Sequence, residues 1–196
     1  MANHVENFIQ IINANEDVLN EVKRIFEKEE GQYDVQTEAL AQRVYGDETP
    51  LEYDREWYTN NCGAKWMYGH IEDDDMEDIS IEITSAWDNI NAWVDRFAQN
   101  LRKIKSDVIV HNTYEDEGYN FAGVYYTSAE YDDNEGIDMG EYEDTPIWED
   151  DDARDRYFDE LRSILDMHRQ CHIDAIADMN ENPDDYSDVT DKDLMS

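Results

Sequence analysis

Three residues toward the C-terminal end of the chain have side chains that commonly bind transition metals. His168, Cys171 and His172 fall on adjacent turns of a helical segment, and Asp174 or Asp178 could add a carboxylate. A single helix, however, presents too few ligands on one side to complete a tetrahedral site. The glutamate of a His-Glu-x-x-His motif is also missing. We therefore interpret both histidines as amphipathic residues at the edge of a packed face, and we predict no metal and no cofactor.

The acidic run at 132–136, Asp-Asp-Asn-Glu-Gly, has the composition of a calcium-binding loop. If Gly136 takes the sixth position of an EF-hand loop, Tyr131 falls at the first position and Tyr142 at the twelfth. Both positions require carboxylate oxygens. The spacing therefore predicts no EF-hand, although a dense carboxylate cluster can still bind divalent cations loosely.

The motifs of common enzyme classes do not occur in the sequence. It contains no Gly-x-Ser-x-Gly nucleophile elbow, no P-loop and no Gly-x-Gly-x-x-Gly dinucleotide motif. A catalytic carboxylate pair cannot be singled out from 51 Asp and Glu residues. We therefore predict that the chain is not an enzyme.

The strongest signal in the sequence is its negative charge. The 196 residues include 51 Asp and Glu against 15 Lys and Arg, which gives a formal net charge of −36, yet 40% are hydrophobic and 12% are aromatic. Because disordered chains are poor in aromatic residues, this composition predicts a folded body. Binding to a phosphate backbone requires lysine and arginine. We therefore predict no direct binding to nucleic acid or to an anionic membrane.

The sequence also carries the features of a cytoplasmic protein. The sequence contains no run of about 18 apolar residues, which is the length needed to span a bilayer. The segment 1–6 lacks the basic and apolar regions of a signal peptide. Cys62 and Cys171 form no pairing motif, so both are expected as reduced thiols.

The elements that must position these residues follow from hydrophobic periodicity and capping residues. Alternating patterns predict strands over residues 4–13, 63–71, 79–84, 107–114 and 119–127. Helical spacing predicts helices over residues 16–30, 37–45, 88–104 and 153–179. Asn15 and Asp88 are expected as N-caps, and Gly31 and Gly46 as helix stops.

Two further expectations concern the run at 72–78 and the core. That run is too charged to be buried and predicts a solvated hairpin loop between two strands. The predicted helix over 88–104 carries one apolar stripe, made of Ile90, Trp93, Val94, Phe97, Leu101 and Ile104. Aromatic residues of neighbouring elements are also expected in the core, namely Trp66, Tyr68 and Trp87.

The order strand, helix, strand, strand, helix, strand predicts an α+β fold. It is the order of the ferredoxin-like split βαβ arrangement, an antiparallel sheet with its helices on one face. An acidic extension and a long C-terminal helix follow it. We expect a domain at 1–127, an acidic segment and helix at 128–182 packed on or beside it, and a disordered tail at 183–196.

Three short stretches of the sequence carry a family resemblance. Residues 61–66, Asn-Cys-Gly-Ala-Lys-Trp, are similar to a Trp-Gly-x-Lys-Trp strand start, and residues 83–87, Ile-Thr-Ser-Ala-Trp, to a Phe-x-Thr-Ala-Trp strand end. Residues 114–123 are similar to an acidic turn before a last strand. Together the three resemble the YubB-type ferredoxin-like domain family of phage and plasmid proteins over about residues 1–127. The resemblance implies a ferredoxin-like fold, a mobile-element origin and no catalytic residues.

The acidic surface is therefore the main functional signal. We expect a phage-encoded nucleic-acid mimic in the host cytoplasm that occupies the DNA- or RNA-binding surface of a basic host protein, such as a defence protein. The alternative is a non-catalytic interaction or structural module whose acidity serves only solubility. The sequence leaves the oligomeric state open. The expected partner-binding residues come from the two densest carboxylate runs: Glu72, Asp73, Asp74, Asp75, Glu77, Asp78, Asp132, Asp133, Glu135, Asp138, Glu141, Glu143, Asp144, Glu149, Asp150, Asp151 and Asp152.

Overall fold

The chain forms two compact units, Met1–Thr145 and Pro146–Ser196. The computed structural model describes residues 3–75, 78–118, 121–129 and 132–138, together with residues 163, 167, 170 and 174. The last four are helical and exposed. The rest of the helix predicted over 153–179, and the tail predicted from 183, lie outside the described residues, and the domain division at residue 127 stays a prediction.

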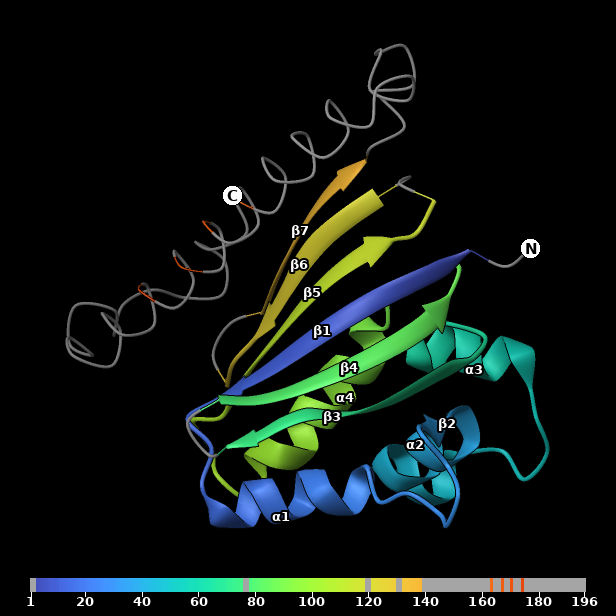
Figure 1. The fold of residues 1–196 in the computed structure, drawn as a ribbon, viewed down its shortest axis with the longest axis horizontal. Coiled ribbons are helices and arrows are strands. Elements are labelled where there is room, and N and C mark those ends of the chain that lie inside the picture. The colour runs from blue at the N-terminus through green and yellow to red at the C-terminus, as the bar shows by residue number, and fades with distance from the viewer. Residues whose placement is uncertain are drawn as a thin grey trace. The chain divides into compact units, whose positions relative to one another are not determined.

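The first unit is built on one open antiparallel sheet with the strand order β2-β3-β4-β1-β5-β6-β7 (Figure 1). Its strands are β1 (His4–Ile12), β2 (Val35–Gln36), β3 (Met67–Asp75), β4 (Asp78–Ala86), β5 (Ile109–Asp116), β6 (Phe121–Thr127) and β7 (Asp132–Asp138). Because β2 has two residues, six longer strands form the body of the sheet. The α+β class and the antiparallel sheet predicted from the sequence are confirmed.

The helices that the structure describes in this unit cover one face of the sheet (Figure 1). They are α1 (Glu16–Ile25), α2 (Thr37–Tyr45), a 3-10 turn η1 (Gly46–Glu48), α3 (Arg55–Cys62) and α4 (Asn91–Arg102). Their apolar residues share one core with the strands. Within the described ranges, none of the helices has the length and apolar character needed to cross a membrane.

The two faces of the sheet differ because side chains alternate along each strand. In β1, Val5, Ile9 and Ile11 are buried toward the helices, whereas Glu6 and Phe8 point to the opposite side. We call this opposite side, away from the helices, the open face.

A buried polar network crosses the helix-facing side of the sheet. The Asn7 amide nitrogen donates to the Ser85 hydroxyl oxygen at 2.9 Å, and the Asn112 amide nitrogen donates to Asn7 Oδ1 at 3.2 Å. Asn112 also donates to Asn91 Oδ1 at 2.9 Å, at the first residue of α4. Buried polar groups are costly unless they are hydrogen-bonded. This network therefore fixes the position of α4 over β1 and β5.

Two helix boundaries differ from those predicted. The first helix ends at Ile25 instead of residue 30, because Arg43 donates to the carbonyl oxygens of Ile25 and Glu27, each at 2.8 Å, and satisfies the end of the helix. The predicted cap Asn15 is confirmed, since its side chain accepts from the Val18 amide at 2.9 Å. Asp88 is not the cap of α4; its carboxylate accepts instead from the amide of Asn89.

Three other sequence expectations are corrected. The acidic residues at 72–75 belong to β3 instead of a hairpin loop, because their backbone pairs with β4. Trp87 has 53% of its surface exposed and Ile104 has 41%, so neither is a core residue, whereas Trp93 and Phe97 are fully buried. The helix α3 and the strand β7 were not predicted. Asp54 caps α3 by accepting from two backbone amides.

We expect Gly69→Ala to destabilise the fold. An alanine Cβ at this position in β3 would lie 2.3 Å from the carbonyl oxygen of Glu82 and 2.7 Å from Ile83 Cγ1. The first atom belongs to the backbone, so strands β3 and β4 would have to separate. Overpacking of this kind costs about 1–3 kcal/mol, which denaturant unfolding can measure. An unchanged free energy of unfolding would show that the two strands separate without cost.

Candidate acidic interaction surface

The first predicted carboxylate run lies on a paired strand. Residues 72–75 form the end of β3 and are all exposed. Asp73 and Asp75 pair with Ser80 and Asp78 of β4, after a register shift that follows Ile71. Because pairing with β4 fixes the backbone of Asp73, Asp74 and Asp75, these carboxylates are held in place, unlike those of a flexible loop. Glu77 and the side chain of Asp78 lie outside the described parts.

One carboxylate of this run has a cationic partner that the sequence did not indicate. Lys23 Nζ of α1 lies 2.6 Å from Asp74 Oδ2, and both side chains are about half exposed. The hydrogen bond from Lys23, followed by its charge, lowers the pKa of Asp74 below its usual value. Asp74 is therefore already engaged by the protein itself.

The second predicted run begins on β7. Asp132 pairs with Thr127 of β6, and its side chain is exposed. Asp133, Glu135 and Asp138 also belong to this strand. The backbone of residues 132–136 is thus that of a strand and not that of an EF-hand loop. Predicted residues of this run that lie outside the described part are Glu141, Glu143, Asp144, Glu149, Asp150, Asp151 and Asp152.

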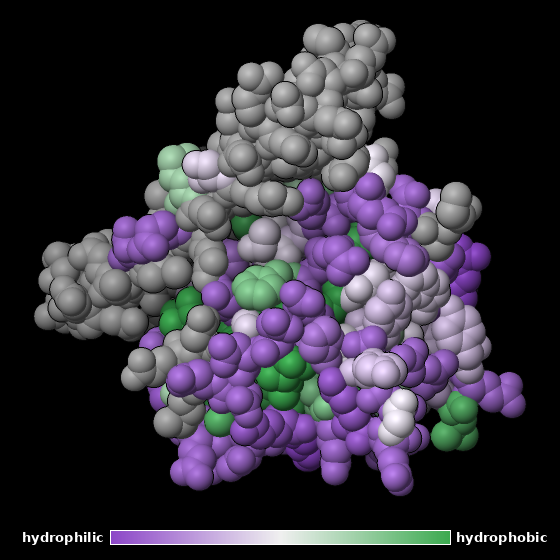
Figure 2. Space-filling model, viewed as in Figure 1, coloured by the Kyte–Doolittle hydropathy of each residue, from purple (hydrophilic) through white to green (hydrophobic). Residues whose placement is uncertain are grey.

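The open face brings together carboxylates that the sequence analysis did not select. Glu6 of β1 stands directly opposite Glu115 of β5, and Glu82 of β4 stands opposite Phe8 of β1. These side chains help to line a hollow of about 220 Å³, together with Thr113 and the neighbouring backbone. Figure 2, which views this side of the sheet, shows mainly hydrophilic residues on it. Polar and apolar residues alternate over 4–13 and 79–84, and this alternation could have predicted that Glu6 and Glu82 face away from the core.

The pairing of Glu6 with Glu115 has a physical cost. Like charges directly opposite one another destabilise a pair of strands. The Thr84 hydroxyl donates to Glu6 Oε2 at 2.9 Å and orients that carboxylate. Places where a fold departs from local stability rules are often functional, so the open face joins the two runs as part of the candidate surface.

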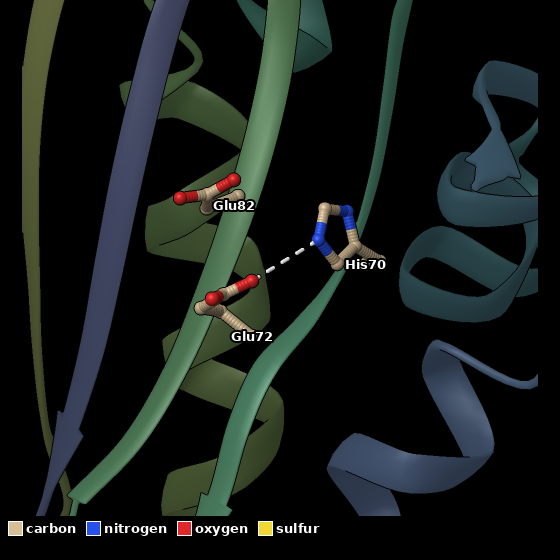
Figure 3. Close-up of side chains that lie close together, drawn as sticks. All are labelled: His70, Glu72 and Glu82. Atoms are coloured by element: carbon tan, nitrogen blue, oxygen red, sulfur yellow. Dashed lines mark hydrogen bonds and ion pairs between the residues drawn. The ribbon is translucent and has the colours of Figure 1, made fainter. Parts of the chain in front are cut away.

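A histidine adjoins the carboxylates of the open face. His70 of β3 pairs with Glu82 of β4, and Glu72 lies two residues further along β3. The imidazole Nε2 is 3.3 Å from Glu72 Oε2, and its Nδ1 is 3.0 Å from Asp34 Oδ1. One ligand atom each from His70, Glu72 and Glu82 lies within 4.8 Å of the other two (Figure 3).

Aromatic side chains gather near the end of β4. Trp87, the exposed residue that follows this strand, has a positive φ of 75°, which is rare for a large side chain. Lys65 Nζ lies 5.0 Å from the centre of its ring. Trp66 and Tyr68 of the neighbouring segment stack at 5.8 Å. These residues form a partly exposed aromatic group rather than the core positions that were predicted.

The remaining candidate residues form no site within the part of the chain that the structure describes. His168, Cys171 and His172 lie outside the described residues, as does Asp178, while Asp174 is helical and accepts from Gln170 at 2.8 Å. Cys62 is a fully buried thiol of α3. Burial raises the pKa of Cys62 to about 12. Because the thiolate is the reactive form, Cys62 is a packing residue and not a nucleophile.

Comparisons with known protein families, curated proteins and solved structures find no match to this chain. The resemblance to YubB-type domains therefore depends on the three sequence stretches alone.

Proposed function

We propose that the chain is an acidic binding protein that occupies the DNA- or RNA-binding surface of a basic partner protein. The observation that carries the proposal is the display of carboxylates on paired strands, in a chain with a net charge of −36. Fixed charges lose less entropy on binding than mobile ones. A rigid acidic sheet is therefore better suited to this role than a flexible acidic tail.

The spacing of the carboxylates supports the proposal. Adjacent strands lie about 4.8 Å apart, and same-face residues lie about 6.6 Å apart along a strand. Successive phosphates on one DNA strand advance about 3.4 Å along the helix axis. Glu6, Glu82 and Glu115 on three adjacent strands thus present negative charge at a density comparable with that of a phosphate backbone.

We also propose that the body is ferredoxin-like. The order β3-β4-β1-β5, with α1 between β1 and β3 in sequence and α4 between β4 and β5, supports this assignment. The three sequence stretches similar to YubB-type domains suggest a phage or plasmid protein, and hence a host protein as the partner. A defence protein that binds nucleic acid is the partner class that such an origin favours.

A competition experiment tests the proposal. The full chain is immobilised and exposed to a bacterial lysate at about 150 mM salt, where the Debye length is about 8 Å. We expect it to retain one nucleic-acid-binding protein selectively. When the purified partner is mixed with labelled nucleic acid, the chain should displace the label at a near-stoichiometric ratio, as measured by fluorescence anisotropy.

Polyglutamate of matched total charge is the control, because it carries the charge without the fold. A mimic should displace the label at a far lower concentration than polyglutamate does. Equal potency of the two competitors, or retention of no nucleic-acid-binding protein, would reject mimicry. The acidity would then be explained by solubility alone.

A further inference from the structure

We propose that His70, Glu72 and Glu82 form a binding site for a divalent transition-metal ion on the open face of the sheet. The three residues converge because β3 and β4 are paired: His70 stands opposite Glu82, and Glu72 follows on the same strand (Figure 3). The site does not depend on the proposed function, and it uses a histidine that the acidic surface does not require.

The separation of the ligand atoms suits a single ion after small movements. They now lie within 4.8 Å of one another. A tetrahedral ion about 2.1 Å from each ligand holds its ligands about 3.4 Å apart. Both glutamates are exposed, so their side chains can turn inward without disturbing the core. Three protein ligands leave a fourth position open to water or to a group from a partner.

Asp34 supplies an independent reason to expect a metal. It immediately precedes β2, whose Val35 pairs with Gly69 of β3, and its carboxylate lies 3.0 Å from His70 Nδ1. Metal-binding histidines commonly donate the proton of one ring nitrogen to a carboxylate, which directs the other nitrogen toward the ion. In the tautomer that carries its proton on Nδ1, the hydrogen bond to Asp34 leaves Nε2, which lies 3.3 Å from Glu72 Oε2, with the electron pair that an ion would take.

The ligand set determines the class of ion. Calcium and magnesium bind oxygen ligands, whereas imidazole favours zinc and its neighbours in the first transition row. One nitrogen and two carboxylate oxygens therefore indicate Zn²⁺, Co²⁺ or Mn²⁺ in preference to Ca²⁺. The histidine also distinguishes this site from the carboxylate runs, which would bind cations loosely and without selectivity.

Calorimetric titration of the full chain with Zn²⁺ tests the site. We expect one ion to bind at a defined site, with affinity reduced at least about tenfold in His70→Gln and in Glu82→Gln, because each removes a ligand. Asp34→Asn keeps all three ligands but weakens the orientation of His70, so its affinity should fall about 10- to 100-fold. Circular dichroism establishes that each variant is folded; Glu82 is exposed, so its variant should retain the fold.

Matched controls separate this site from others. His4→Gln removes another histidine, which lies 3.7 Å from Glu117, and should leave zinc affinity unchanged. The double change His168→Gln and His172→Gln removes the histidine pair near the C-terminus and should also leave the affinity unchanged. If His70 instead only bridges Asp34 and Glu72 as a structural ion pair, His70→Gln will not change zinc binding. That result, or the absence of a defined zinc site in the wild-type chain, would overturn the proposal.

Discussion

Replacing Trp93 by alanine should lower the free energy of unfolding by about 3–5 kcal/mol, the usual loss when a large buried aromatic side chain is removed. Trp93 is fully buried in α4, stacks on Phe97 at 4.9 Å and meets Phe26 edge to face at 6.2 Å. Its indole nitrogen donates to the Leu40 carbonyl oxygen at 3.4 Å, so it joins α4 to α1 and α2. Denaturant unfolding followed by circular dichroism measures the loss.

The matched control is Trp87→Ala, which makes the same chemical change at an exposed position. Trp87 is 53% exposed, and its main described contact is with the Lys65 ammonium. Its replacement should cost less than about 1 kcal/mol. A loss below about 1 kcal/mol for Trp93→Ala, or equal losses for both variants, would show that the core is not organised around α4.

The buried stripe of α4 is the feature that the sequence predicted best. Residues at helical spacing must share one face, and Trp93, Val94, Phe97 and Leu101 are all fully buried. The alternating isoleucines of β4 were predictable for the same reason, since period-two spacing places Ile79, Ile81 and Ile83 on one face of a sheet. Patterns of this kind depend on local geometry, which the sequence contains.

The boundaries that were mispredicted depend on contacts between distant residues. The amide of Ile90 donates to Asn7 Oδ1 at 3.3 Å, which holds the segment before α4 outside the helix despite the favourable cap residue Asp88. Arg43 ends α1 in a similar way, from 18 residues further along the chain. Neither hydrogen bond can be inferred from local helix propensity, because only the tertiary structure brings its two partners together.

The candidate site was partly predictable for the same physical reasons. The carboxylate run at 72–75 is visible as composition, but its strand pairing is not. Predicting that His70, Glu72 and Glu82 lie together requires the register of β3 against β4. Predicting that Asp34 lies beside His70 requires the register of β2 against β3. Only the His-x-Glu spacing at 70–72 signals that two of these side chains share a face of a strand.

Reversing the charge of Asp73 and Asp75 together should slow association with the proposed partner by about tenfold or more at low salt. Attraction between complementary surfaces raises association rates by about 10- to 1,000-fold and weakens as salt screens it. Both residues are exposed on β3 and neither belongs to the proposed metal site, so Asp73→Lys with Asp75→Lys should leave the fold intact. Biolayer interferometry measures the association rate at about 50 and about 150 mM salt, because the Debye length shortens between these two concentrations.

The control reverses an equal amount of charge elsewhere, through Asp47→Lys with Glu52→Lys. Both residues are exposed and lie in and after η1, between α2 and α3. Each double change replaces two negative charges by two positive ones, so the net charge moves from −36 by +4 to −32 in both variants. If binding depends on where the carboxylates stand, the β3 variant should lose far more than the control, because screening confines the interaction to nearby charges. Equal losses would mean that the partner responds to net charge alone, and a specific acidic surface on β3 would then be rejected.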